Sequence, residues 1–184
     1  HDEAASHLQE VIRLQATRAE AHFNLANSFM LGGHIEQALA SYRRAVELRG
    51  DHAPWRYNLG VALARAGDNR AAQGEFRTAA QLDSGYTAAW NGLARSLVGQ
   101  TQLNDAEIRE ALAAAERAAE LTGRQNVGVL DTLAAAHASA GDFAKAIEIV
   151  ENVLSQSAGQ LTEQVASQLT QRLAAYRQGR RDVP

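Results

Sequence analysis

Apolar residues recur along the chain at steps of three and four, a spacing that places them on one face of an α-helix. The first clear example contains Leu25, Ala26 and Phe29. Gly32 and Gly33 follow, and glycine readily adopts the left-handed conformation found at helix ends. The pattern predicts pairs of helices joined by short turns, without strands. The first four predicted helices cover residues 19–31, 35–48, 55–65 and 69–82.

The helix pairs recur with a period of 34 residues. Leu25, Leu59 and Leu93 are separated by this interval, and each is followed by Ala or Gly. Ala38 and Ala72 allow close approach within a pair, while Tyr42 and Phe76 fill the space between successive pairs. A fixed period of this length predicts a solenoid, in which each unit packs only against its neighbours. Other positions in phase are Gly33 and Gly67, Ala4 with Ala38 and Ala72, Leu8 with Tyr42 and Phe76, and Leu14 with Leu48 and Leu82.

Two segments depart from the regular period. Leu93 and Leu133 are 133 − 93 = 40 residues apart, and the excess lies within 99–110. There, Asn104 and Glu107 have the spacing of a capping box, which predicts a helix from Asp105 to Leu121 preceded by a protruding loop. We interpret the extra residues as a tolerated surface insertion rather than a binding loop. Near the end, residues 160–178 have the pattern of a capping helix that is apolar inside and polar outside.

We therefore expect one continuous all-α solenoid domain. Its expected parts are the second helix of a truncated repeat over 1–18, repeats over 19–52 and 53–86, a repeat with an insertion over 87–126, a repeat over 127–155 and a capping helix over 160–178.

The repeated unit resembles that of the tetratricopeptide repeat family along nearly the whole chain. The resemblance is closest in Trp55-Arg56-Tyr57-Asn58-Leu59-Gly60, Gly67-Asp68, Ala72, Phe76 and Ala79. Gly50 and Ser84 replace the family's usual proline, and Thr101 replaces a turn glycine. The resemblance implies a right-handed α-solenoid. The final part of the chain looks like that of bacterial members, whose repeats are often attached to a larger body, including membrane glycosyltransferases.

Composition narrows the possible functions. The absence of cysteine excludes disulfides, thiolate metal sites and cysteine nucleophiles. A net charge of −3, from 18 basic and 21 acidic side chains, gives no electrostatic reason to expect nucleic-acid binding. No apolar run approaches the roughly 20 residues that cross a bilayer, so we expect no direct membrane insertion. We expect a soluble domain. Its compartment is left open by the sequence, between the bacterial cytoplasm and, if the chain is part of a larger exported or membrane protein, the periplasm.

Residues that could support catalysis are not arranged for it. The histidines form neither a His-x-His pair nor an i,i+4 pair, and the glycines form no phosphate-binding loop. Acidic side chains such as Glu116 and Glu120 lie near arginines, as expected for ion pairs on helix surfaces. We therefore expect no enzyme activity, cofactor or metal. The histidines, interpreted as packing or surface residues, are His1, His7, His22, His34, His52 and His137.

The family resemblance implies that the first helices of successive repeats line a concave groove. Asn24 and Asn58 occupy equivalent positions there, and their amides could bond the backbone of an extended peptide. Tolerance of asparagine on a solvated surface explains them equally well. The candidate peptide-binding residues are Phe23, Asn24, Asn27, Tyr57, Asn58, Val61, Arg65, Asn91 and Arg95. Asp131, Thr132 and Ala135 occupy the same positions in a later repeat.

The favoured function is a non-catalytic scaffold that binds a partner peptide or helix in this groove. We do not expect the family's carboxylate clamp, because Phe23, Ala88 and Gly92 occupy its basic positions. One alternative is a structural module that forms homo-oligomers through the N-terminal edge, where residues 1–18 supply a second helix without its first-helix partner. Another is the repeat region of a larger enzyme, such as a membrane glycosyltransferase.

Overall fold

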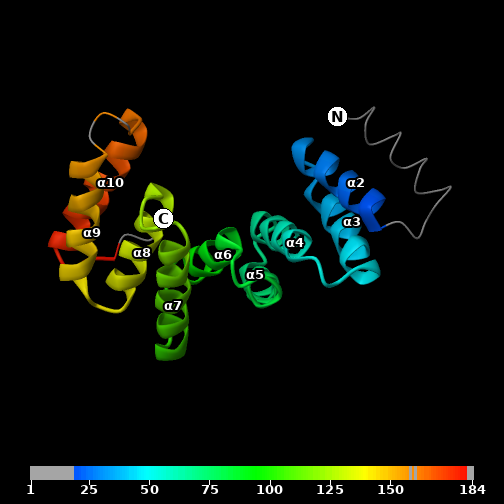
Figure 1. Ribbon diagram of the computed structural model, residues 1–184, viewed down its shortest axis with the longest axis horizontal. Helices are drawn as coiled ribbons and strands as arrows, with labels where there is room; N and C mark the ends of the chain where they lie inside the picture. The colour runs from blue at the N-terminus through cyan, green and yellow to red at the C-terminus, as the bar shows by residue number, and fades with distance from the viewer. Residues whose placement is uncertain (1–18, 158, 160, 182–184) are drawn as a thin grey trace. The chain divides into compact units, whose positions relative to one another are not determined.

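The computed structural model describes residues 19–157, 159 and 161–181, which form nine α-helices and no strand (Figure 1). The all-α prediction is confirmed for this part of the chain. The helix expected over 1–18, and association through it, lie outside the described residues. The helices are α2 (Ala19–Leu31), α3 (Ile35–Leu48), α4 (Ala53–Arg65), α5 (Asn69–Leu82), α6 (Thr87–Val98), α7 (Asp105–Leu121), α8 (Val127–Ser139), α9 (Phe143–Gln156) and α10 (Glu163–Arg177).

Helices α2, α3, α5 and α7 have the boundaries that the sequence pattern predicts. Helix α4 instead begins two residues earlier, at Ala53, and includes Pro54 in its first turn. Proline is suited to that position because its fixed φ matches the helix. It also lacks an N–H, which costs no hydrogen bond there because N–H groups in the first turn have no acceptor within the helix. Helix α10 is shorter than predicted, because Thr162 caps it by accepting a hydrogen bond from the backbone N–H of Val165 at 3.3 Å.

The turns within the first two helix pairs have the same geometry. Gly33 and Gly67 have φ angles of +79° and +86°, values that a side-chain-bearing residue rarely adopts. In each turn the residue after the glycine donates its N–H back into the first helix, from His34 to Phe29 at 2.8 Å and from Asp68 to Leu63 at 3.0 Å. The 34-residue period of the sequence is therefore a period of the backbone as well.

The described residues divide into two compact units, the first ending at residue 92 and the second beginning at residue 93. In the first unit, α2 packs on α3 and α4 packs on α5. Phe76 of α5 lies so close to Gly60 of α4 that an added Cβ would be 2.7 Å from its ring. The same ring is 3.1 Å from the Cβ position of Gly92. Phe76 therefore fills the space between successive pairs, as the sequence indicates.

In the second unit, α8 packs against both α7 and α9, and α10 packs against α9. Leu133, Ala134 and Ala136 of α8 are completely buried. Tyr176 of α10 is also completely buried. The guanidinium of Arg172 on α10 pairs with Asp131 of α8 at 2.6 Å, so an ion pair joins the last helix to this core.

Candidate peptide-binding surface

Tyr42 on α3 orients one of the candidate residues of α2. Its buried hydroxyl, on α3, donates a hydrogen bond to Oδ1 of Asn27 on α2 at 2.6 Å. Burial raises the pKa of Tyr42 to about 12, and the positive charge of Arg65 on α4 acts in the opposite direction. The phenol therefore stays protonated at neutral pH and fixes the orientation of the Asn27 amide. From the sequence, Tyr42 is assigned only to packing between helix pairs. The signal for its polar role is the hydroxyl, which Phe76 lacks one repeat later.

The two equivalent asparagines, Asn24 and Asn58, do not have equivalent environments. Asn24 is exposed on α2. Asn58 is half-buried, and its Nδ2 donates to the carbonyl of Pro54, one turn earlier in α4, at 2.8 Å. Such local bonds between a side chain and the backbone are common for asparagine. Asn58 can therefore offer a peptide mainly its carbonyl oxygen, whereas Asn24 can offer both a donor and an acceptor.

The aromatic candidates are half-buried in packing contacts. The ring of Phe23 stacks on Trp55, with centroids 5.1 Å apart, and lies 5.6 Å from the ring of Tyr42. Tyr57 packs against Phe76 and Tyr86, with a centroid distance of 5.5 Å in each case. These rings stabilise the helix pairs of the first unit and leave only part of their surface for a ligand.

The remaining candidates differ in exposure. Arg65, in the last turn of α4, is exposed, and Val61 one turn earlier is half-buried. Asn91 of α6 is half-buried, and its Oδ1 is buried without a hydrogen-bond partner among the described residues. Arg95 is exposed but belongs to the second unit. The first unit thus contains every candidate except Arg95.

The corresponding positions of α8 in the second unit are already engaged. Thr132 and Ala135 are buried, and the hydroxyl of Thr132 donates to the carbonyl of Gly128 at 2.9 Å. Asp131 is paired with Arg172. Thr132 and Ala135 therefore offer a peptide little surface, and the carboxylate of Asp131 is already paired with a residue of α10.

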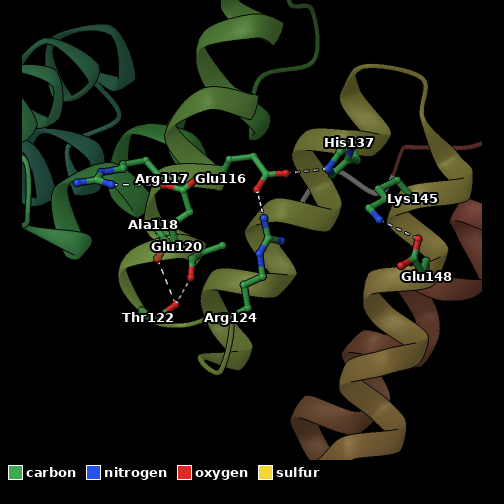
Figure 2. Close-up of polar contacts among 10 residues, drawn as sticks. Glu116, Arg117, Ala118, Glu120, Thr122, Arg124, His137, Lys145 and Glu148 are labelled. Carbon is green, nitrogen blue, oxygen red and sulfur yellow. Dashed lines mark hydrogen bonds and ion pairs between the residues drawn. The ribbon is translucent and has the colours of Figure 1, made fainter.

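The charged side chains around His137 join the elements of the second unit. Figure 2 shows Glu116 of α7 between Arg124, at 2.5 Å, and His137 of α8, at 3.5 Å. The other ring nitrogen of His137 is 3.5 Å from Asp142, the N-cap of α9. His137 is thus a largely buried residue between helices. Within the described ranges, no group of three or more His, Asp or Glu side chains could hold a metal ion.

Comparisons with known proteins agree with this architecture. Residues 19–52 match the pattern that defines the tetratricopeptide repeat. A tetratricopeptide-repeat-containing protein of Pseudomonas aeruginosa is 35% identical over 108 residues, which cover 52% of this chain and 44% of that protein. The chain therefore spans less than half the length of this curated relative.

Solved structures show the same fold at low sequence identity. YrrB, described as a tetratricopeptide repeat protein with an unusual peptide-binding site, is 16% identical with a TM-score of 0.76, over 92% of this chain and 83% of its own. MamA from Desulfovibrio magneticus RS-1 is 17% identical with a TM-score of 0.75, over 88% of each chain. The first tetratricopeptide repeat domain of Spaghetti (RPAP3), bound to an HSP90 peptide, is 18% identical with a TM-score of 0.59, over 66% of this chain and 92% of its own.

The chain thus carries a tetratricopeptide repeat at 19–52 and has the all-α solenoid fold of tetratricopeptide repeat proteins. Among the described residues, no helix is both long enough and apolar enough to span a membrane.

Proposed function

We propose that the chain is a non-catalytic scaffold whose first unit binds an extended segment of a partner protein. The binding surface consists of the first helices of its repeats, with Asn24, Asn58 and Arg65 as the main polar contacts. The observation that supports this most is the ring of Phe23 on α2, which stacks on Trp55 of α4 with centroids 5.1 Å apart. The candidate positions of two successive repeats therefore adjoin each other.

The exposed groups suit a peptide backbone. The amide of Asn24 can both donate and accept, the carbonyl of Asn58 can accept, and the guanidinium of Arg65 can donate. An extended segment presents N–H and C=O groups in alternation, so such contacts bind it with little dependence on its sequence. Peptide binding by proteins of the same fold, YrrB and the RPAP3 domain, adds support.

A peptide selected against the chain tests the proposal. We would select from a random peptide library displayed on phage, then measure the affinity of the best peptide by isothermal titration calorimetry. Replacing Asn24 and Asn58 together by Ala should weaken binding by about 1 to 3 kcal/mol, the cost of leaving backbone polar groups unpaired. The control is Arg43→Ala, at an exposed position of α3, which should bind as the unchanged chain does.

Two outcomes would contradict the proposal. If the double variant keeps full affinity, the peptide binds elsewhere. If no peptide can be selected, the self-assembling module that we considered from the sequence becomes the better explanation.

A further inference from the structure

The segment that follows α10 leaves the helix in a defined direction. Gly179 has a φ of +66°, and its N–H donates to the carbonyl of Tyr176 at 2.9 Å. The N–H of Arg180 donates to the carbonyl of Ala175 at 3.0 Å. These two bonds form a glycine-based turn of the kind that ends many helices. Because Tyr176 is completely buried, the turn is attached to the core of the second unit.

The two arginines after this turn make different contacts. Arg180 donates from Nε and Nη2 to Oε1 of Gln178, at 3.1 and 2.7 Å, and this contact is local. Arg181 donates from Nη2 to the backbone carbonyl of Gln100 at 3.0 Å, across 81 positions of sequence. Gln100 lies two residues beyond the end of α6. Arg181 is half-buried there, although it is one of the last residues that the structure describes.

The end of α6 is a suitable place for a guanidinium. The last carbonyls of a helix have no partner within it and carry a partial negative charge, which favours a cation. The N–H of Gly99 donates to the carbonyl of Arg95, and the N–H of Gln100 donates to the carbonyl of Leu97, each at 3.0 Å. The helical turn therefore continues to Gln100, whose own carbonyl lies at the end of this turn.

The contact joins the two ends of the second unit. Residues 178–180 are held in the turn at the end of α10, so the long side chain of Arg181 completes the distance to the end of α6. In Figure 1 the chain after α10, drawn in red, runs from the end of α10 toward α8.

We propose that residues 178–181 act as an internal ligand, a strap that binds the end of α6 through Arg181. The strap occupies the edge of the second unit where α6 ends, so a partner that binds this edge must displace it and supply its own cation. This inference concerns the second unit and does not depend on peptide binding by the first.

Hydrogen exchange of the full chain tests the contact. In Arg181→Ala, amides of residues 97–103 should exchange about tenfold faster, because a hydrogen bond from a charged donor has been lost there. Arg180→Ala is the matched control and should leave these residues unchanged, since the guanidinium of Arg180 bonds its sequence neighbour Gln178. Equal exchange at 97–103 in the unchanged chain and in Arg181→Ala would overturn the proposal, as would an equal acceleration in both variants.

A second measurement tests whether the edge accepts such a ligand from outside. The probe is the blocked peptide Gln-Gly-Arg-Arg, the sequence of residues 178–181, added at millimolar concentration while amide NMR signals are followed. It should shift signals of 97–103 in Arg181→Ala and leave them in place in the unchanged chain, whose strap is bound. A peptide with the final arginine replaced by Ala should shift neither. The absence of any shift at 97–103 in the variant would overturn the assignment of this edge as a ligand site.

Discussion

Gly60 is a residue whose size determines how two helices pack. A Cβ at this position would be 2.7 Å from the ring of Phe76, a separation that side-chain atoms do not tolerate without displacement. Phe76 is itself buried and also lies close to Gly92, so it has little freedom to move. Gly60→Ala should therefore lower the free energy of unfolding by about 1 to 3 kcal/mol, measured by urea denaturation.

Gly74 provides the control, because it lies within α5 and a Cβ added there would have no neighbour within 4 Å. Gly74→Ala should raise the stability by up to about 1 kcal/mol, since Ala favours the helix over Gly. If both substitutions have the same effect, the close approach of Gly60 and Phe76 is not what limits this position.

Tyr42 makes stability depend on pH in the alkaline range. Its pKa is about 12 in the folded chain, against 10.0 for an ordinary tyrosine, because burial disfavours the phenolate. The folded state therefore holds this proton more tightly than the unfolded state does. The contribution of this proton to the free energy of unfolding is fully present below pH 10 and is lost as the pH rises toward 12. The loss should reach up to about 2 kcal/mol.

Tyr42→Phe isolates this effect. The variant should be about 1 kcal/mol less stable at pH 8, because it lacks the hydrogen bond to Asn27. Between pH 10 and 12 it should lose less stability than the unchanged chain, as followed by urea midpoints at several pH values. Parallel losses in the two proteins would show that Tyr42 does not titrate as the structure indicates.

At the same scale, sequence identifies positions but not bonds. The spacing of 34 residues correctly pairs Asn24 with Asn58 as equivalent positions of two repeats. It cannot show that the Asn58 amide bonds Pro54, because that depends on a side-chain rotamer and on where α4 begins. The interaction between Tyr42 and Asn27 likewise requires two helices to be placed in space before it can be seen.

At the scale of the helices, α7 begins in the segment that contains the inserted residues, and a capping box defines its first turn. Asn104 accepts hydrogen bonds from Ala106 and Glu107 at 2.9 and 3.0 Å, and Glu107 accepts one from the Asn104 N–H at 2.9 Å. This is the capping box that the sequence predicts. Asn104→Ala should reduce stability by about 1 kcal/mol and speed hydrogen exchange in the first turn of α7.

Thr101→Ala, at an exposed position of the same loop, is the control for α7 and should change neither quantity. Equal losses in the two variants would mean that the loop as a whole, rather than the cap, determines where α7 starts.

Helix boundaries were predictable here because caps and glycine turns are local, whereas contacts between helices were not. Gly50 illustrates the limit. From sequence it is only a departure from the usual proline, but its carbonyl accepts a hydrogen bond from Arg56 at 3.0 Å, and Arg56 also pairs with Glu75 at 3.0 Å. A Cβ on residue 50 would lie 3.1 Å from the Arg56 guanidinium, so the glycine leaves room for this contact between helices.

At the scale of the whole molecule, the repeat period predicts the all-α solenoid class but not the division into two units. That division depends on how packing contacts are distributed among the helices. Within the second unit, Arg172 of α10 pairs with Asp131 of α8. The prediction of a capping helix did not include this ion pair, and so it did not reveal that Asp131 is occupied. The assignment of residues to individual repeats stays a prediction.

Substitutions in two matched ion pairs test whether the two units are destabilised separately. In the first unit, Arg56 pairs with Glu75 at 3.0 Å. In the second, Arg172 pairs with Asp131 at 2.6 Å, and all four side chains are partly buried. Asp131→Asn should cost about 2 kcal/mol, because it leaves a partly buried guanidinium without its carboxylate, and Glu75→Gln should cost about the same. In a solenoid, stability is a sum of local terms, so hydrogen exchange should accelerate in α8–α10 for the first variant and in α4–α5 for the second. If either substitution accelerates exchange equally in both units, the chain unfolds as a single cooperative body, and the two compact units are not independent units of stability.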